Sequence, residues 1–331
     1  MEVALNYIEN YRYIKKEKRE NISAKPFLKW AGGKTQLIPN IENALPENIY
    51  TDKVTYIEPF VGSGAVLFWI LNRFPNIDKA VINDINEDLI NTYKVIQNSP
   101  EKLISILEII QREFHALEGF EDAKKEYYYS KRTLFNQKSE DKISHAALFI
   151  FLNKTCFNGL YRVNRNNEFN VPMGSYKLPT ICDKDNIIAA SEVLQKVEIL
   201  CGDYEQTLEF ASSNTFFYFD PPYKPLNRTS NFNSYSKEVF DDIEQLGLRD
   251  FCNKLDSLGH KWMLSNSDTY DKFFDNIYIK YNIQRINAKR MINSKSDRRG
   301  FLTELLITNS YARKPLALAT WRNCVSYKDA T

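Results

Sequence analysis

The feature that most constrains the fold is an apolar run that ends in two prolines. Residues 215–219 are β-formers without a polar break, and Asp220-Pro221-Pro222-Tyr223 follows directly. Such a run is typical of a strand buried on both faces of a parallel sheet. Proline cannot donate a hydrogen bond to a ladder, so the two prolines end the strand. The sequence therefore predicts a carboxylate and a tyrosine on a stiff turn at the carboxyl end of a strand.

The chemistry of this turn suits a planar ligand that carries an exocyclic amine. Ligands of open α/β sheets bind at the carboxyl ends of the strands. Asp220 and the turn carbonyls can accept hydrogen bonds from the amine, and Tyr223 can stack on the ring. The alternative is a plain strand-end turn with an aspartate at the surface, because short motifs also occur by chance.

A second strand, followed by a glycine turn, is predicted near residue 60. Residues 54–60 are typical of a strand, and Gly62 and Gly64 come before the next helix. Glycines let the backbone approach a ligand closely. NAD enzymes also use such turns, but the third glycine of their fingerprint would fall at Leu67. The leucine at this position disfavours NAD.

Two aspartates end strands in positions that suit a nucleotide. Asp84 follows a strand at 80–82, where nucleotide-binding folds place the acceptor for ribose hydroxyls. Asp203 follows a strand at 197–200 and can meet the adenine ring of a nucleotide cofactor. Each aspartate can instead cap a helix, and for Asp84 both roles are compatible.

Residues 26–35 combine glycines with a tryptophan and a lysine. Gly33-Lys34-Thr35 is similar to the end of a P-loop, but that pattern requires a glycine where this chain has Leu28. What remains is a glycine turn at a helix N-terminus, next to Trp30 and Lys34. Such a turn can hold a carboxylate and cover an apolar ring.

The alternation of strands and helices breaks between about residues 90 and 185. Residues 87–155 have helical periodicity, and residues 156–180 are loop-like and rich in asparagine. Amides, arginines and aromatic rings interleave in this loop. That mixture suits the reading of base edges, because arginine offers two parallel donors to guanine. An ordinary β-turn or hairpin explains the composition equally well.

Alternation resumes after residue 185. A polar loop at 224–235 can close over a substrate, and a helix at 237–257 and strands at 260–264 and 302–308 follow. Residues 280–299 hold the clearest basic patch, which is either a phosphate-contact surface or a solvated loop. Its basic residues are Lys280, Arg285, Lys289, Arg290, Lys295, Arg298 and Arg299.

Composition narrows the functional classes. The 331 residues carry a formal net charge of only +2, so bulk charge does not indicate a nucleic-acid partner. The five cysteines are odd in number, far apart and without a C-x-x-C pair, which argues against a zinc site or a disulfide framework. That usage fits a reducing cytoplasm. Without a signal peptide or a long apolar span, we expect no membrane insertion.

Six segments of the chain stand in the order of a known family. They are Phe27-Leu28-Lys29-Trp30-Ala31-Gly32-Gly33-Lys34, Glu58-Pro59-Phe60-Val61-Gly62-Ser63-Gly64, Asn83-Asp84-Ile85-Asn86, Phe157-Asn158-Gly159-Leu160-Tyr161-Arg162, Glu168-Phe169-Asn170-Val171-Pro172 and Asp220-Pro221-Pro222-Tyr223. This combination resembles the Dam-type (α-class, D12 class) DNA adenine-N6 methyltransferases, including the GATC-modifying methylases of restriction-modification systems. The resemblance covers roughly residues 25–310.

The resemblance implies an α/β fold. We expect a Rossmann-like, seven-stranded mixed-sheet methyltransferase core with an inserted, mainly helical DNA target-recognition domain. The S-adenosylmethionine-binding catalytic domain would comprise residues 25–90 and 186–312, and the recognition domain residues 91–185. Residues 1–24 would form an N-terminal extension and residues 313–331 a C-terminal tail.

The same resemblance implies the residues of the catalytic and cofactor sites. Asp220 and the Pro221 carbonyl would hold the amino group of the target adenine, on a turn completed by Pro222, and Tyr223 would stack on the flipped base. The cofactor-binding residues would be Trp30, Gly33, Lys34, Glu58, Phe60, Gly62, Gly64, Asp84, Asp203 and Asp220. Within this set, Trp30 and Lys34 would line the methionine end of the cofactor, Asp84 would bind the ribose and Asp203 would lie near the adenine.

Residues that read the DNA site follow from the resemblance as well. They would be Phe157, Asn158, Leu160, Arg162, Asn170 and Pro172. Phe157 replaces a tyrosine of some relatives but keeps the stacking face. Ser175 is a departure, since several relatives carry an arginine there, and one DNA contact of the family is therefore not expected in this chain.

The implied reaction is direct, in-line transfer of the methyl group of S-adenosylmethionine to N6 of an adenine flipped out of double-stranded DNA, without a metal. The site would be GATC, and the role that of a protective methylase whose cognate restriction endonuclease acts on the same site without direct contact. We expect a cytoplasmic monomer or weak dimer, associated with the nucleoid through DNA. Methylation of RNA adenine or of protein glutamine amides, and a DNA-binding relative without catalysis, remain as alternatives.

Overall fold

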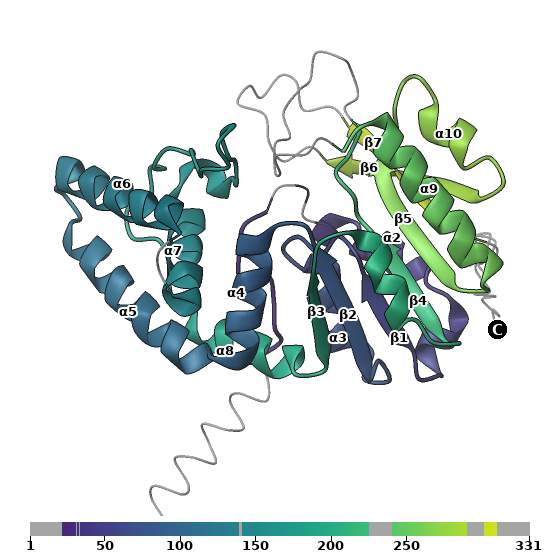
Figure 1. Ribbon diagram of the computed structural model, residues 1–331, viewed down its shortest axis with the longest axis horizontal. Helices are drawn as coiled ribbons and strands as arrows, with labels where there is room; N and C mark the ends of the chain where they lie inside the picture. The colour runs from purple at the N-terminus through teal and green to yellow at the C-terminus, as the bar shows by residue number, and fades with distance from the viewer. Residues whose placement is uncertain are drawn as a thin grey trace, which may run out of the picture.

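The computed structural model centres on one seven-stranded sheet with helices on both faces and at one end (Figure 1). It describes residues 22–30, 32, 34–138, 141–224, 240–289 and 301–309, without the side chains at 288–289 and 301–302. Four expectations lie mostly or wholly outside these residues: the N-terminal extension, Gly33, the polar loop at 224–235 and the C-terminal tail.

The sheet is mixed, as expected. Its strand order is β3-β2-β1-β4-β5-β7-β6. The first five strands in this order pair in parallel, whereas β7 runs antiparallel to both β5 and β6. The strands are β1 (Thr55–Glu58), β2 (Lys79–Asp84), β3 (Val197–Cys201), β4 (Thr215–Phe219), β5 (Lys261–Ser267), β6 (Asn282–Lys289) and β7 (Phe301–Thr308).

Strand β4 lies in the middle of this sheet, and its composition follows from that position. All five of its residues are buried. Phe216 and Tyr218 join the apolar cluster on one face, whereas Phe217 and Phe219 join the cluster on the other. A strand covered on both faces needs apolar side chains at every position, which explains the unbroken run of β-formers.

Helices cover the two faces unequally. One cluster joins β4 to α3, α4 and α8, and the other joins it to α9 and α10. The helices are α2 (Ile38–Asn43), α3 (Ala65–Arg73), α4 (Glu87–Asn98), α5 (Pro100–Ala116), α6 (Glu121–Gln137), α7 (Lys142–Thr155), α8 (Lys184–Leu194), α9 (Asp242–Ser257) and α10 (Phe273–Ile277), with short 3-10 turns η1 (Lys34–Gln36), η2 (Glu47–Tyr50), η3 (Phe157–Gly159) and η4 (Tyr204–Phe210).

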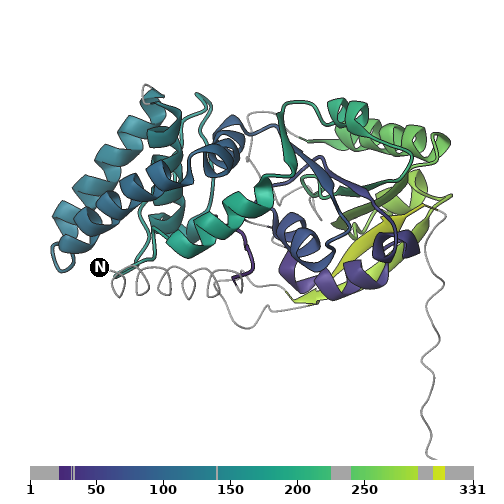
Figure 2. The same cartoon turned by 90° about the horizontal axis from the view of Figure 1, so that it is seen from below.

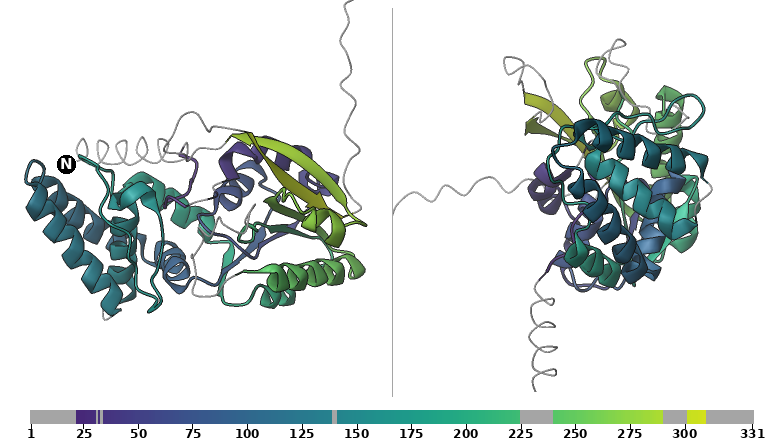
Figure 3. Two further views of the ribbon diagram at one scale, coloured as in Figure 1. Left: turned by 90° about the horizontal axis from the view of Figure 1, so that it is seen from above. Right: turned by 90° about the vertical axis from the view of Figure 1, so that its left-hand side faces the viewer.

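Helices α5, α6 and α7 gather at the end of the molecule opposite β6 and β7 (Figures 2 and 3). Helix α7 is the apolar centre of this group, because nearly all of its residues from His145 to Thr155 are buried. The helical pattern predicted for 87–155 is confirmed, with breaks only between the four helices. The apolar cluster of these helices is continuous with the core over the sheet.

The segment after α7 returns on itself. Cys156 pairs with Met173, and Val163 pairs with Phe169, each in an antiparallel bridge. Asn164 accepts backbone hydrogen bonds from Asn166 and Glu168 and so fixes the turn between the two arms. This is the hairpin that the sequence allowed as one explanation of the asparagine-rich composition.

The patch predicted at 280–299 differs from expectation in part. Residues 282–289 form strand β6 rather than a loop, and 290–299 lie outside the described residues. Arg285 donates to Asp268 and Asp275, with distances from 2.7 to 3.3 Å. Its Nε and Nη2 donors are therefore engaged by protein carboxylates, which disfavours Arg285 as a phosphate contact. The sequence did not reveal β6 as a strand because it contains charged residues. In the described sheet β6 pairs with β7 alone, and such an edge strand tolerates charged residues that obscure the strand pattern.

Candidate active site

A cavity of about 430 Å³ opens at the carboxyl ends of β1, β2 and β4, where the sequence predicted a ligand site. The parallel pairing of these strands brings their last residues to one edge of the sheet. Eight of the ten expected cofactor-binding residues line the cavity; Gly64 lies outside the lining and Gly33 outside the described residues. The lining includes Trp30, Lys34, Glu58, Phe60, Gly62, Asp84, Asp203, Asp220, Pro221, Pro222, Tyr223, Phe240 and Glu244.

The glycine turn after β1 is shaped by the protein's own packing. Gly62 and Gly64 have φ angles of +49° and +73°, a region that other residues rarely adopt. A Cβ atom on Gly62 would lie 3.2 Å from the Trp30 indole, and one on Gly64 would lie 2.5 Å from the Tyr93 hydroxyl. The sequence suggested room for a ligand, and the structure adds a tryptophan and a tyrosine that exclude any side chain at the turn.

Asp84 holds this turn against the end of β2. Its carboxylate accepts hydrogen bonds from the Gly62 and Asn86 amides, each at 3.0 Å. Burial raises the pKa of Asp84, and these backbone donors oppose the rise. The N-cap of α4 is Asn86, whose side chain accepts from the Leu89 amide, so the capping role considered for Asp84 belongs to its neighbour.

Asp203 stands at the end of β3 and has a structural task of its own. Its carboxylate accepts a hydrogen bond of 2.7 Å from the Glu205 amide and caps η4. Next to it the cavity wall becomes aromatic, because the ring of Phe60 lies 5.2 Å from that of Tyr204 and 5.6 Å from that of Phe240. Sequence reasoning missed Tyr204 and Phe240, since neither belongs to a motif.

Glu58 is a buried acid at the end of β1. Only 2% of it is exposed, and it accepts a hydrogen bond of 2.7 Å from the Tyr56 hydroxyl. Burial is the main cause that raises the pKa of Glu58 well above its ordinary value, and the nearby carboxylates of Asp220 and Asp84 add to the effect. Compared with a glutamate in water, Glu58 is therefore shifted toward its protonated form.

Lys34, Asp220 and Tyr223 form one contact group at the edge of the cavity. The Lys34 ammonium lies 2.9 Å from Asp220 Oδ1 and donates to the Gly32 carbonyl at 2.7 Å. The same ammonium lies 4.3 Å from the centroid of the Tyr223 ring. The sequence predicted all three side chains at the site, but not that one lysine would join the other two.

Asp220 has a second donor on β5. The Ser265 hydroxyl donates to Asp220 Oδ1 at 3.0 Å, so both donors meet the same oxygen. Burial raises the pKa of Asp220, whereas Lys34 and Ser265 lower it. Among the described residues, none donates to Asp220 Oδ2, which leaves this oxygen able to accept a hydrogen bond from a ligand.

Tyr223 is anchored from β7. Its hydroxyl donates to Glu304 Oε2 at 2.8 Å. One end of the side chain is thus fixed by this hydrogen bond, and one face of the ring lies under the Lys34 ammonium. Ser265 and Glu304 had no signal in the sequence, since they reach the site only through the pairing of β4, β5 and β7.

The residues expected to read DNA lie outside the cavity, on the hairpin after α7. Phe157 is 52% exposed, a large fraction for a phenylalanine. The Arg162 guanidinium is exposed and donates to Asn170 Oδ1 at 2.7 Å, and the Pro172 carbonyl accepts from the Phe157 amide at 2.9 Å. The structure therefore brings Phe157 together with Pro172, and Arg162 with Asn170.

Tyr161 joins this hairpin to the cavity wall. Its ring stacks on Trp30, with centroids 5.6 Å apart and planes 18° apart. Its hydroxyl donates to Asp88, a buried acid on α4 that also contacts His145 at 2.9 Å. Burial acts to raise the pKa of Asp88, but His145, Lys138 and Tyr161 outweigh it and the pKa is lowered.

Two features are absent from the described part of the chain. No helix there is both long and apolar enough to cross a membrane. No three or more histidine, cysteine or acidic side chains among those residues are grouped so that they could hold a metal ion.

Comparison with known proteins decides the family. The model of the D12 class N6 adenine-specific DNA methyltransferases matches residues 30–292. The chain belongs to this class. The match spans both the cavity and the helical end of the molecule, and it confirms the resemblance carried by the six motifs. For this D12 methyltransferase the family implies S-adenosylmethionine as the methyl donor.

Individual relatives agree over nearly their full length. The Type II methyltransferase M.MjaIII of Methanocaldococcus jannaschii is 50% identical over 292 residues, which cover 87% of this D12 methyltransferase and 100% of that protein. The Type II methyltransferase M1.LlaDCHI of Lactococcus lactis subsp. cremoris is 42% identical, with coverages of 88% and 97%. The DNA adenine methylase of Escherichia coli (strain K12) is 32% identical, with coverages of 85% and 93%.

Proposed function

We propose that the chain transfers a methyl group from S-adenosylmethionine to N6 of an adenine flipped out of double-stranded DNA, within GATC. The observation that carries the proposal is the contact group of Lys34, Asp220 and Tyr223 at the edge of the cavity. It offers a carboxylate oxygen for an amino group and an aromatic ring for a base. Family membership supplies the reaction class.

The residues of the cavity fit S-adenosylmethionine. The rings of Phe60, Tyr204 and Phe240 suit an adenine at the end near Asp203. Asp84 lies at the end of β2, where an acid can accept from ribose hydroxyls. Trp30 and Lys34 then border the methionine end, and the glycine turn at Gly62 and Gly64 passes beneath the cofactor.

The target amino group would bind between Asp220 and the Pro221 carbonyl. The adenine amine is a poor nucleophile because its lone pair is delocalised into the ring. Hydrogen bonds to Asp220 Oδ2 and to the Pro221 carbonyl draw the nitrogen toward tetrahedral geometry and aim it for in-line attack. S-adenosylmethionine would supply a methyl group activated by its sulfonium, and the bond from sulfur to that methyl would break as the bond to N6 forms. As the new N–C bond forms, N6 has a surplus proton, and Asp220, whose pKa burial raises, is placed to accept it.

Base flipping needs its own stabilisation. Extruding a base costs a few kcal/mol. Stacking on Tyr223 contributes about 1–3 kcal/mol and offsets much of that cost. Glu304 keeps the Tyr223 ring in place through the hydrogen bond to its hydroxyl. The Lys34 ammonium covers a face of the same ring, so it either shares the ring with the incoming base or moves as the base enters.

Within the proposed recognition domain of residues 91–185, we assign sequence recognition to the hairpin after α7. The exposed ring of Phe157 can stack on a base. Asn158, Leu160 and Pro172, the other recognition residues on this side of the hairpin, lie next to it, since the Phe157 backbone bonds those of Leu160 and Pro172. Asn170 orients the Arg162 guanidinium, and an arginine held in this way can present two donors to a guanine. The serine at 175 leaves one contact of the family without its arginine.

The biological role we propose is that of the protective methylase in a restriction-modification system. Two relatives that match 87% and 88% of this chain carry the name Type II methyltransferase. A cognate endonuclease would act on the same DNA site without contacting this protein. The enzyme would act as a monomer or weak dimer.

Methyl transfer to three duplexes tests the proposal. One contains GATC, the second has the same bases in scrambled order, and the third has GATC with the adenine amino group removed. We expect label from S-adenosylmethionine on the first duplex only. Label on the first two would refute the GATC assignment and keep adenine methylation. Transfer to none of them, despite tight cofactor binding, would refute DNA as the substrate.

A further inference from the structure

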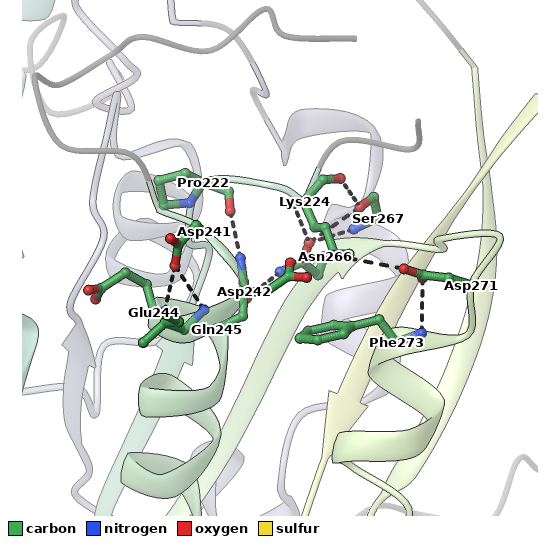
Figure 4. Close-up of polar contacts among 11 residues, drawn as sticks. Pro222, Lys224, Asp241, Asp242, Glu244, Gln245, Asn266, Ser267, Asp271 and Phe273 are labelled. Atoms are coloured by element: carbon green, nitrogen blue, oxygen red, sulfur yellow. Dashed lines mark hydrogen bonds and ion pairs between the residues drawn. The ribbon is translucent and has the colours of Figure 1, made fainter. Parts of the chain in front are cut away.

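The turn formed by residues 220–224, called the catalytic turn below, has few backbone hydrogen-bond donors of its own. Pro221 and Pro222 have no N–H groups, so hydrogen bonding within the turn is restricted where geometry matters most. The polar groups at the end of the turn bind side chains from α9 and β5 instead (Figure 4).

Gln245 holds the Pro222 carbonyl. This side chain is fully buried, donates through Nε2 to the Pro222 carbonyl at 3.0 Å, and accepts at Oε1 from Asn266 Nδ2 at 3.3 Å. Asp241 caps α9 through the Ile243 and Glu244 amides, which fixes the first turn of the helix. Gln245 therefore reaches the catalytic turn from the capped first turn of α9, as Figure 4 shows.

Asn266 and Ser267 hold the next residue. Asn266 is fully buried on β5, and its Oδ1 accepts from the Lys224 amide at 3.3 Å and from the Ser267 amide at 2.9 Å. The Ser267 hydroxyl donates to the Lys224 carbonyl at 2.7 Å. The Lys224 ammonium contacts Asp242 at the start of α9 and lies 3.9 Å from Asp271. The turn is thus tied to β5 and α9 on both sides of Tyr223.

We propose that Gln245 and Asn266 are positioning residues for methyl transfer. By fixing the Pro222 carbonyl and the Lys224 amide, they set the direction of the Pro221 carbonyl and of the Asp220 carboxylate toward the target amino group. Neither lines the cavity, so neither is placed to touch the cofactor, whereas the adjacent Glu244 does line it. The inference rests on the proposed role of Asp220.

The chemistry of the two amides explains why this arrangement specifies one geometry. Each amide has both a donor and an acceptor, and in this network Gln245 uses both groups. An apolar residue at 245 would leave the Pro222 carbonyl and the Asn266 amide without a buried partner, and each would favour a shift toward water. A displacement of about 1 Å at a reacting group is enough to slow a reaction about 100-fold.

The test compares Gln245→Leu with Gln97→Leu. Gln97 on α4 lies outside both the cavity and the hairpin that is proposed to read DNA, and it makes the same kind of contact: it donates to the carbonyls of Leu194 on α8 and Val197 on β3, at 2.7 and 2.8 Å. We expect Gln245→Leu to slow single-turnover methyl transfer to the GATC duplex about 100-fold, with the cofactor Kd and duplex Kd nearly unchanged. Gln97→Leu should lower the Tm and leave the rate unchanged.

The pH dependence of the rate of Gln245→Glu is a further test, because a loss of stability alone would not produce it. An ionised carboxylate at this position repels the Pro222 carbonyl, whereas a protonated carboxyl can donate to it. The rate of Gln245→Glu relative to wild type should therefore recover as the pH falls. A rate of Gln245→Leu equal to that of wild type, or an equal slowing by Gln97→Leu, would overturn the proposal.

Two measurements separate failure of the positioning role from failure of the proposed function. They are methyl transfer by the wild-type protein and hydrogen exchange of one amide. If wild type transfers no methyl group to any duplex, the assignment of the reaction is wrong. The positioning role is then judged on the Lys224 amide, which donates to Asn266. Its exchange should accelerate in Gln245→Leu and not in Gln97→Leu, and unchanged protection in both would overturn the inference.

Discussion

Replacing Lys34 with methionine is expected to destabilise the protein by an amount that depends on pH. Lys34 lies 2.9 Å from Asp220, and the exposed fractions of the two side chains are 6% and 20%. Methionine keeps an unbranched side chain but removes the charge, so the carboxylate stays buried without its cation. Breaking a buried pair costs about 3–5 kcal/mol, and we expect about 3 kcal/mol at pH 7.5 because Asp220 keeps some contact with solvent.

Protonation of Asp220 limits this loss at lower pH. Burial raises the pKa of Asp220 above 3.8, and without the opposing effect of Lys34 the pKa rises further. A carboxyl group whose folded-state pKa is raised loses stability as the pH climbs from its ordinary value toward the folded value. Protonating it costs at most about 2.3 kcal/mol at pH 5.5, against about 5 kcal/mol at pH 7.5. The loss of unfolding free energy should therefore fall to about 2 kcal/mol or less at pH 5.5.

Urea unfolding at pH 5.5, 6.5 and 7.5 measures this difference. Lys124→Met is the matched control, since Lys124 is 2% exposed and contacts Glu118 and two backbone carbonyls away from the cavity. Glu118 is 34% exposed and can hydrate when its partner is lost, so the loss in this variant should not vary with pH. An equal loss for Lys34→Met at pH 5.5 and 7.5 would refute the claim that Lys34 governs the ionisation of Asp220.

Three further variants test other parts of the protein. The raised pKa of Glu58 destabilises the folded state as the pH climbs above 4.5. Glu58→Gln should therefore gain stability over wild type with rising pH, by no more than about 1.4 kcal/mol per unit, in urea titrations from pH 4.5 to 8; a stability difference that does not change with pH would contradict this. Arg162→Ala should relax discrimination at one base by about 1–3 kcal/mol in kcat/KM for single-base site variants, and Asn170→Ala should affect the same base more weakly. A uniform loss across all sequences would make Arg162 a phosphate contact instead.

The core of the fold was predictable because its signals are local. The unbroken run before Asp220 predicted a central strand, and β4 has the predicted bounds of 215–219. The glycine turn and the acids at 84 and 203 marked the edge of the sheet that lines the cavity. Strand β6 was missed because it carries charged and polar residues that a sheet edge tolerates.

The supporting residues of the site could not be predicted, because their signals are long-range. The strand predicted at 260–264 extends to Ser267, and Ser265, Asn266 and Ser267 are the polar residues that support the catalytic turn. Polar residues at a strand end resemble a loop in a sequence. Gln245 is one polar residue in an amphipathic helix, and only the tertiary fold shows that it is buried against Pro222.

The most direct test of the account is methyl transfer by Asp220→Ala to the GATC duplex, with cofactor affinity measured on the same sample. Asp220 lies at the cavity edge, and the account assigns it to the adenine amino group rather than to retention of the cofactor. We predict that single-turnover transfer is abolished while the Kd for S-adenosylmethionine changes little. Transfer that persists in the variant together with a large loss of cofactor affinity would contradict the central claim.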